Sequence, residues 1–167
     1  MLRELIHVYK YGRVKTLARP LGGLLAAALP RDERFDAMAP APLHWRRQWQ
    51  RGFNQSELLA RDLARRTGIP VVHALRRVRS TSIQAGLINT ARRKNVAGAF
   101  CARPRLVAGK RILLIDDVMT TGSTAAACAS ALKRAGAARV ALLTVARVDK
   151  RIGAARAPEY LTAGGGA

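Results

Sequence analysis

The spacing of apolar residues predicts helices in three parts of the chain. In residues 1–30, apolar residues recur every three or four positions, which is the helical period. Pro20 lies inside this stretch and either kinks one helix or stands in the first turn of a new one. Residues 54–68 have an asparagine that can cap a helix, apolar positions on one face, and a closing glycine. Residues 125–135 form the third expected helix.

Mainly apolar stretches predict buried strands between these helices. They are residues 35–43, which run into a Pro-rich turn, residues 112–115, which are continuously apolar, and residues 140–145; the two valines at 71–72 start another. Residues 76–95 are rich in Arg, Ser, Thr, Gln and Asn with weak periodicity, so we expect a mobile loop there. Strand, helix and strand in sequence predict an α/β fold with a parallel sheet and right-handed crossovers.

Length and composition bound the organisation of the chain. Its 167 residues suit one domain, which we place at residues 1–150, followed by a disordered tail at 151–167 that ends in GGGA. Cys101 and Cys128 form no C-x-x-C pair, which excludes a disulfide framework or a zinc ribbon in these residues and favours a reducing cytoplasm. There is no apolar run long enough to predict membrane insertion.

Charge is the strongest compositional signal. Lys and Arg number 30 against 10 acidic residues, a formal net charge of +20. Residues 46–111 hold 16 of the basic residues and 2 of the acidic ones. Such an excess attracts nucleic acid, phosphorylated metabolites or an acidic membrane. An arginine-rich genome would explain the same composition, and the aromatic residues are too few for an obvious base-stacking surface.

The segment ILLIDDVMTTGST, residues 112–124, carries the clearest chemistry. Asp116 and Asp117 follow an apolar run, and ligands bind beyond the carboxyl ends of strands in a parallel sheet. The turn into the next helix offers backbone N–H groups and hydroxyl donors for an anion, and Gly122 lets the chain approach a phosphate closely. The acidic pair suits a cation or sugar hydroxyls. A ribose 5-phosphate with bound Mg²⁺ satisfies both requirements.

Other interpretations of this segment explain less of it. The nucleotide-binding patterns G-x-x-x-x-G-K-[ST] and G-x-G-x-x-G are absent. A phosphoacceptor aspartate with Mg²⁺ can end a strand but does not explain the hydroxyl–glycine loop. A helix capped by Thr121 or Thr124 explains one hydroxyl and not the two carboxylates.

IDDVMTTGST resembles the phosphoribosyl-pyrophosphate (PRPP) loop of type I phosphoribosyltransferases. APAPLHWRRQWQRGFNQSELLARDLA, residues 39–64, and QAGLINTARRKNVAGAF, residues 84–100, are similar to signatures of the ComF-type (GntX-like) members. The resemblance extends over residues 5–147. It implies a central parallel sheet flanked by helices, with a flexible loop. Members usually carry a zinc ribbon ahead of this domain, and we expect this chain to lack it.

The resemblance also implies an activity and a set of site residues. The family transfers a phosphoribosyl group from PRPP, with Mg²⁺, to a nitrogen nucleophile; the acceptor here is unknown. The catalytic residues implied are Asp116, Asp117, Arg92 and Arg93, with Asp116 and Asp117 also holding Mg²⁺, directly or indirectly. The PRPP-binding residues implied are Asp116, Asp117, Thr120, Thr121, Gly122, Ser123, Thr124, Arg46, Arg51 and Lys94.

Partners other than PRPP follow from the family's link to competence. They are single-stranded DNA and competence or recombination proteins. A non-catalytic DNA-binding module on the same fold is the alternative function, favoured by the basic residues 46–111, whereas the intact acidic pair favours an enzyme. Trp45, Trp49 and Phe53 are candidates for base stacking, with packing of the loop as the plainer explanation. His44 and His73 are weak candidates for general bases, and the sequence indicates no oligomeric state.

Overall fold

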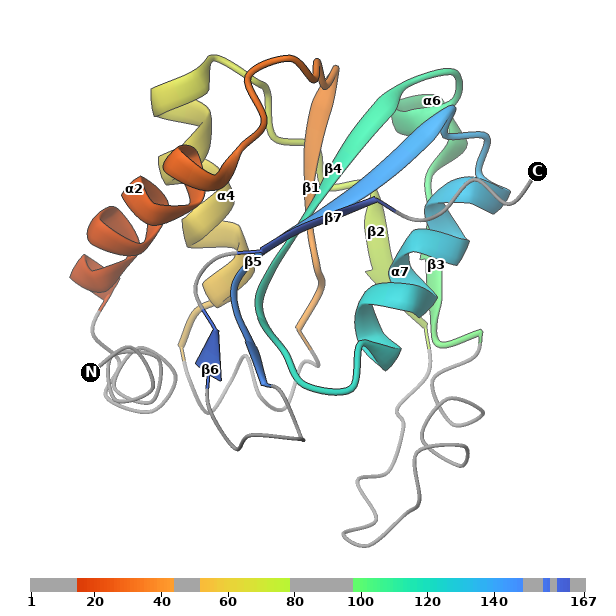
Figure 1. Ribbon diagram of the computed structural model, residues 1–167. Helices are drawn as coiled ribbons and strands as arrows, with labels where there is room; N and C mark the ends of the chain where they lie inside the picture. Colours follow the sequence, from red (N-terminus) through yellow and green to blue (C-terminus); the bar gives the residue numbers. More distant parts are fainter. Residues whose placement is uncertain (1–14, 44–51, 79–97, 149–154, 157–158, 163–167) are drawn as a thin grey trace, which may run out of the picture.

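The computed structural model of the protein describes residues 15–43, 52–78, 98–148, 155–156 and 159–162 (Figure 1). A sheet crosses the middle of the molecule with helices on both of its faces (Figure 1). No helix among the described residues is both long enough and apolar enough to cross a membrane.

The main sheet has a parallel centre and an antiparallel edge. Strands β1 (Ala37–Pro40), β4 (Arg111–Met119) and β5 (Arg139–Val148) are parallel, with β4 in the middle. Strands β6 (Ala155–Arg156) and β7 (Glu159–Thr162) both pair antiparallel with β5. The parallel α/β expectation is therefore confirmed for the centre of the sheet. The tail expected to be disordered contributes β6 and β7, because the outer edge of β5 offers backbone groups for pairing.

A small second sheet packs beside the helix that follows β4. It consists of β2 (Leu75–Arg77) and β3 (Phe100–Ala102), paired antiparallel, and the short helix α6 (Pro104–Val107) follows β3. Strand β2 includes the first two residues of the stretch expected to be a loop. Most of that stretch, residues 79–95, lies outside the described residues.

Helices cover the main sheet in two layers. Helix α2 (Ala18–Ala28), preceded by the 3₁₀ turn η1 (Lys15–Leu17), lies beside α4 (Gln55–Thr67) on one face (Figure 1). Helix α7 (Ser123–Arg134) covers the other face. Along β4, Ile112 and Leu114 belong to the core under α7, and Leu113 and Ile115 to the core under α2 and α4. Both faces of β4 are buried at these positions, which explains why residues 112–115 are continuously apolar.

Most local expectations agree with these elements. Pro20 stands in the first turn of α2, where its missing N–H costs nothing. Asn54 is the N-cap of α4, and Gly68 ends that helix in the left-handed conformation. The valines at 71–72 form an isolated bridge from Val71 to Met38 and no strand. Strand β4 continues four residues beyond the expected end at Ile115, through the acidic pair to Met119.

Candidate functional site

The acidic pair lies inside the central strand rather than after it. Asp116 is in register with Thr144 of β5, and both Asp116 and Asp117 are half-buried. Thr144 is fully buried, and its hydroxyl lies 3.2 Å from the carbonyl oxygen of Asp117. The two carboxylates are therefore carried by a strand whose pairing with β5 extends past them, whereas its pairing with β1 ends at Ile115.

Hydrogen bonds orient both carboxylates. Asp116 Oδ1 accepts from the backbone N–H of Asp117 at 2.9 Å and from the hydroxyl of Ser56 at 3.3 Å. Asp117 Oδ1 accepts from the backbone N–H of Val118 at 2.7 Å. Bonds of this kind to an ionised acceptor are stronger than neutral ones, so they restrict the side-chain orientation.

The start of helix α4 is hydrogen-bonded to the end of the sheet that carries the acidic pair. Asn54 Oδ1 accepts from the N–H of Ser56 at 3.1 Å, and Asn54 Nδ2 donates to the carbonyl of Ala41 at 3.0 Å. One asparagine thus ties the helix to the proline turn after β1 and places Ser56 against Asp116. Our sequence reasoning missed Ser56; its signal was its place two residues after a helix cap, within the RGFNQ-containing signature.

The hydroxyl-rich turn joins β4 to α7. Gly122 is the N-cap of α7 with a φ of 71°, a left-handed conformation that favours glycine. The hydroxyls of Thr121 and Ser123 lie 2.9 Å apart, and the N–H of Ser123 donates to Thr121 Oγ1 at 3.4 Å. The N-cap is therefore neither Thr121 nor Thr124. Ser123 and Thr124 belong to the first turn of the helix, where backbone N–H groups and the dipole favour an anion.

A buried thiol lies on α7 behind this site. Cys128 is fully buried, and its pKa is raised far above the usual value, first by burial and then by the negative charge of Asp116. The positive charge of Arg77 acts in the opposite direction. Cys128 is thus a protonated core residue and not a nucleophile.

The expected basic residues are not placed by this structure. Arg46, Arg51, Arg92, Arg93 and Lys94 lie outside the described residues, so their roles remain predictions.

Of the weaker candidate residues, the structure describes only some. His44, Trp45 and Trp49 also lie outside the described residues. Phe53 is buried in the core under α2 and α4, which fits packing better than base stacking. His73 is exposed and lies 3.2 Å from Glu57, away from the acidic pair.

The acidic pair fits Mg²⁺ held jointly with a substrate. No group of three or more His, Cys, Asp or Glu side chains converges among the described residues, so a cage made by protein alone is not indicated there. Mg²⁺ is commonly bound by one or two carboxylates together with water and substrate oxygens. Asp116 and Asp117 supply two adjacent carboxylates of that kind.

The sheet, the acidic pair and the turn at the head of α7 define a phosphoribosyltransferase-type fold. The family described as the phosphoribosyl transferase domain matches residues 54–162. A solved structure, the glutamine PRPP amidotransferase from B. subtilis complexed with ADP and GMP, aligns with a TM-score of 0.54 and 24% identity. The alignment covers 76% of this chain and 25% of that one, and it supports the fold.

Relatives with curated names narrow the family further. The DNA utilization protein YhgH of Escherichia coli (strain K12) is 38% identical over 154 residues, which cover 87% of this chain and 67% of the relative. Competence protein F of Haemophilus influenzae is 34% identical over 155 residues, covering 87% of this chain and 68% of the relative. The chain belongs to the phosphoribosyl transferase domain family and, within it, to the ComF-type proteins.

Proposed function

We propose that the protein binds PRPP with Mg²⁺ at residues 116–124 and transfers its phosphoribosyl group to an acceptor. The supporting observation is the joining of two oriented carboxylates on β4 to a hydroxyl–glycine turn at the head of α7. One nine-residue segment thereby offers an acidic end and an anion-binding end. Few ligands match that pair of properties as well as a ribose that carries phosphates.

Each end of the segment has a role in the proposed reaction. The turn and the first N–H groups of α7 bind the 5′-phosphate. Asp116 and Asp117 bind the ribose hydroxyls and stabilise positive charge developing on the sugar. Asp116 and Asp117 would hold Mg²⁺, directly or indirectly, and the ion would supply positive charge to neutralise the pyrophosphate. The acceptor nitrogen donates its lone pair to C1 while the C1–O bond breaks, pyrophosphate leaves with that bond's electrons, and the nitrogen loses a proton to solvent.

Calorimetry with PRPP and Mg²⁺ tests the proposal. Asp116→Asn with Asp117→Asn keeps the shape of both side chains and removes both charges, so Mg²⁺-dependent binding should be lost while the fold remains. Asp32→Asn with Glu33→Gln makes the same change of charge away from the site and should bind like the natural protein. Equal PRPP affinity in the site double variant would falsify the assignment.

Single-stranded DNA binding is a second candidate function. It is supported by the net charge of +20 and by the DNA-utilization and competence names of the relatives. It includes the related proposal that competence or recombination proteins are partners in the cytoplasm. Replacing Arg92, Arg93 and Lys94 with Ala should weaken a dedicated site and reduce the salt slope by about 2, at roughly 0.7 per phosphate contact.

A matched triple variant separates a dedicated DNA site from general attraction. Arg76, Arg103 and Arg105 are exposed on the small sheet and the segment after it, and their replacement with Ala removes the same charge. If both triple variants weaken DNA binding equally, net charge alone accounts for the binding. The DNA proposal would then be abandoned and the PRPP proposal retained.

A further inference from the structure

A groove lies between helices α2 and α4, on the sheet face opposite α7. Its volume is about 740 Å³. One side is formed by residues of η1 and the start of α2, the other by one face of α4, with one residue from the segment after α4. Nine of the described residues line it: Lys15, Thr16, Ala18, Arg19, Leu58, Arg61, Ala64, Arg65 and Val71.

The floor of this α2–α4 groove is aliphatic. Leu58, Ala64 and Val71 are half-buried and pack against the core under the two helices, and Ala18 belongs to that core. None of these nine described residues is aromatic. The described part of the floor can therefore receive apolar side chains but offers no ring on which a nucleic-acid base would stack.

The rim of the groove is basic on both sides. Lys15 and Arg19 are four residues apart on one side, and Arg61 and Arg65 are four residues apart on the other. All four side chains belong to exposed residues. Among the residues that the structure describes, the lining contains no acidic one.

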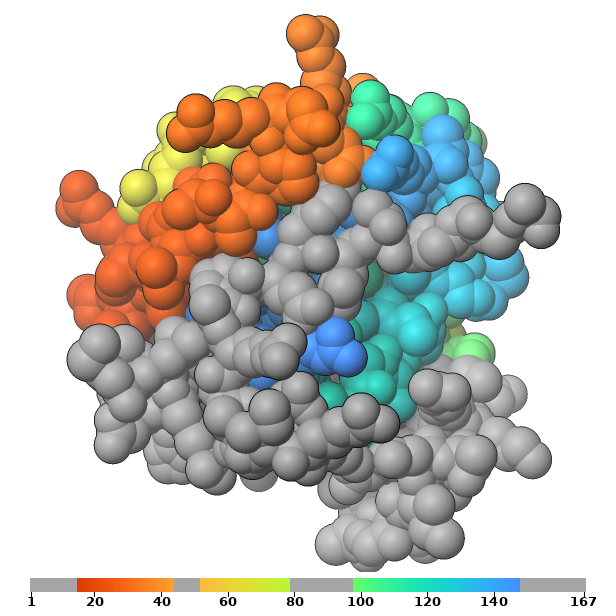
Figure 2. Space-filling model, viewed as in Figure 1, coloured from red at the N-terminus to blue at the C-terminus, as the bar shows by residue number. Residues whose placement is uncertain are grey.

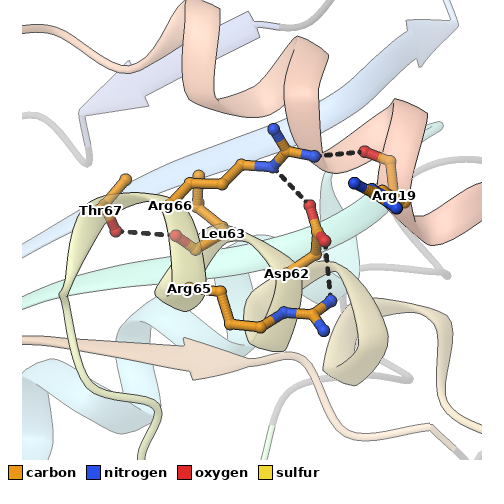
Figure 3. Close-up of polar contacts among 6 residues, drawn as sticks. All are labelled: Arg19, Asp62, Leu63, Arg65, Arg66 and Thr67. Carbon is orange, nitrogen blue, oxygen red and sulfur yellow. Dashed lines mark hydrogen bonds and ion pairs between the residues drawn. The ribbon is translucent and has the colours of Figure 1, made fainter.

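Ion pairs within α4 partly neutralise one side of the rim. Arg61 pairs with Glu57 at 2.7 Å. Asp62 is buried and shares its charge between Arg65, at 2.8 Å, and Arg66, at 2.6 Å (Figure 3).

The other side of the rim carries uncompensated charge. Within the part of the chain that the structure describes, neither Lys15 nor Arg19 forms an ion pair with an acidic residue. Lys15 Nζ lies 5.8 Å from the centre of the Phe53 ring, a cation–π contact. An acidic ligand would gain most from this η1–α2 side, because among the described residues its cations have no ion pair to lose.

We propose that the groove binds an extended peptide of a partner protein in which acidic and apolar residues alternate. Successive side chains of an extended chain point to opposite sides, so apolar residues can enter the floor while acidic residues face the rim. Alternate residues of such a chain are about 6.6 Å apart. Positions four residues apart on one α-helix are about 6 Å apart, so Arg61 and Arg65 of α4 match that repeat. A volume of 740 Å³ is in the range of specific ligand sites.

Fluorescence anisotropy tests the proposal with a labelled octapeptide of alternating Asp and Leu. Lys15→Glu with Arg19→Glu should weaken binding by about tenfold or more, because two attractive contacts become repulsive. Arg103→Glu with Arg105→Glu makes the same change of charge on exposed residues elsewhere and should change the affinity by less than about threefold. Lys15→Gln with Arg19→Gln serves if the reversed pair does not fold, and it should show a smaller loss in the same direction.

Two further comparisons distinguish the proposed peptide binding from general charge attraction and from binding of nucleic acid. An octapeptide of the same composition with its four Asp residues together should bind more weakly than the alternating one, and Leu58→Gln should weaken the alternating peptide at unchanged charge. Equal loss in both double variants, or equal affinity for the two peptides, would overturn the proposal. Tighter binding of an oligothymidylate of equal charge, lost in the Lys15 and Arg19 variant, would assign the groove to nucleic acid instead. These results do not depend on PRPP binding.

Discussion

The two cysteines of the chain have opposite environments. Cys128 is a fully buried residue of α7, and Cys101 on β3 is half-buried beside the exposed Arg103. Burial favours the neutral thiol, which raises the pKa of Cys128, and the nearby charge of Asp116 acts in the same direction. Between pH 8 and 10 Cys128 therefore stays protonated in the folded protein, because thiolate forms only when the pH approaches the raised pKa.

A thiol reagent should accordingly modify one cysteine of the folded protein. We expect Cys101 to react under native conditions, and Cys128 to react only after denaturant is added. Cys101→Ser should remove the reaction seen under native conditions, and Cys128→Ala should leave it unchanged. Rapid modification of Cys128 at pH 8 without denaturant would contradict the burial described here.

Gly122 is the residue on which the turn at the site depends. A side chain at its φ of 71° costs about 1–2 kcal/mol, and a Cβ there would contact Met119 Sδ at an ordinary 3.5 Å. The cost of Gly122→Ala is thus conformational and not steric. We expect a loss of about 1–2 kcal/mol in the free energy of unfolding and weaker PRPP binding. Thr120→Ala, an exposed neighbour without such strain, should stay within about 0.5 kcal/mol in denaturant titrations.

At the scale of elements, helices α2 and α4 meet at Gly22, a residue of α2 that has no side chain. A Cβ built on Gly22 would lie 2.9 Å from Asp62 Cγ and nearer still to Asp62 Oδ2, a distance that real contacts do not show. The Asp62 carboxylate occupies that space while it holds Arg65 and Arg66, and Arg66 also donates to the carbonyl of Arg19 at 3.0 Å (Figure 3). Gly22 thus permits a buried carboxylate between the two helices.

Adjacent glycines in α2 provide a matched test of this contact. Gly22→Ala should destabilise the protein by about 2–4 kcal/mol, because Asp62 must move from its buried ion pairs. Gly23→Ala meets only the Arg66 guanidinium at 3.8–3.9 Å and should be neutral or stabilising by up to about 1 kcal/mol, since alanine favours the helix. Thermal unfolding of the two variants measures the difference. Similar melting temperatures would contradict the role given to Asp62.

Local patterns in the sequence were sufficient to predict α2, α4, α7 and the central strands β1, β4 and β5, but not their ends. The apolar run at 112–115 predicted the core of β4, yet the strand continues through Asp116 and Asp117 because β5 pairs with it as far as Met119. That pairing involves residues about 30 positions away, which a local pattern does not contain. Strands β6 and β7 were missed for the same reason, since only the edge of β5 gives that short tail a partner.

At the scale of the whole molecule, distant segments meet at one end of the sheet. Ser56 contacts Asp116 across 60 positions in sequence, and Asn54 contacts Ala41 across 13. The acidic pair and the turn could be predicted because they are contiguous and chemically distinctive. Ser56 could not, because its role depends on the way α4 packs against β4. In Figure 2 the surface of α2, in red and orange, lies to the left and that of α7, in teal, to the right.

Binding at a site built from several segments should stabilise the entire fold. A ligand that binds only the folded state at one hundred times its Kd adds about 2.7 kcal/mol to the free energy of unfolding. For a domain of this size that corresponds to a rise of roughly 5–10 °C in melting temperature. We therefore expect saturating PRPP to raise the melting temperature in the presence of Mg²⁺ and to have much less effect when the metal is chelated.

The Asp116 and Asp117 double variant and its control test whether that stabilisation comes from binding at the site. Asp116→Asn with Asp117→Asn should abolish the PRPP-dependent rise, because the acidic end of the site no longer binds the metal or the ribose hydroxyls. Asp32→Asn with Glu33→Gln should keep it, because it makes the same change of charge elsewhere. Pyrophosphate is the second control, since a strongly basic protein attracts any polyanion. A rise of equal size with pyrophosphate, or with PRPP in the Asp116 and Asp117 variant, would show that net charge and not the described site is responsible.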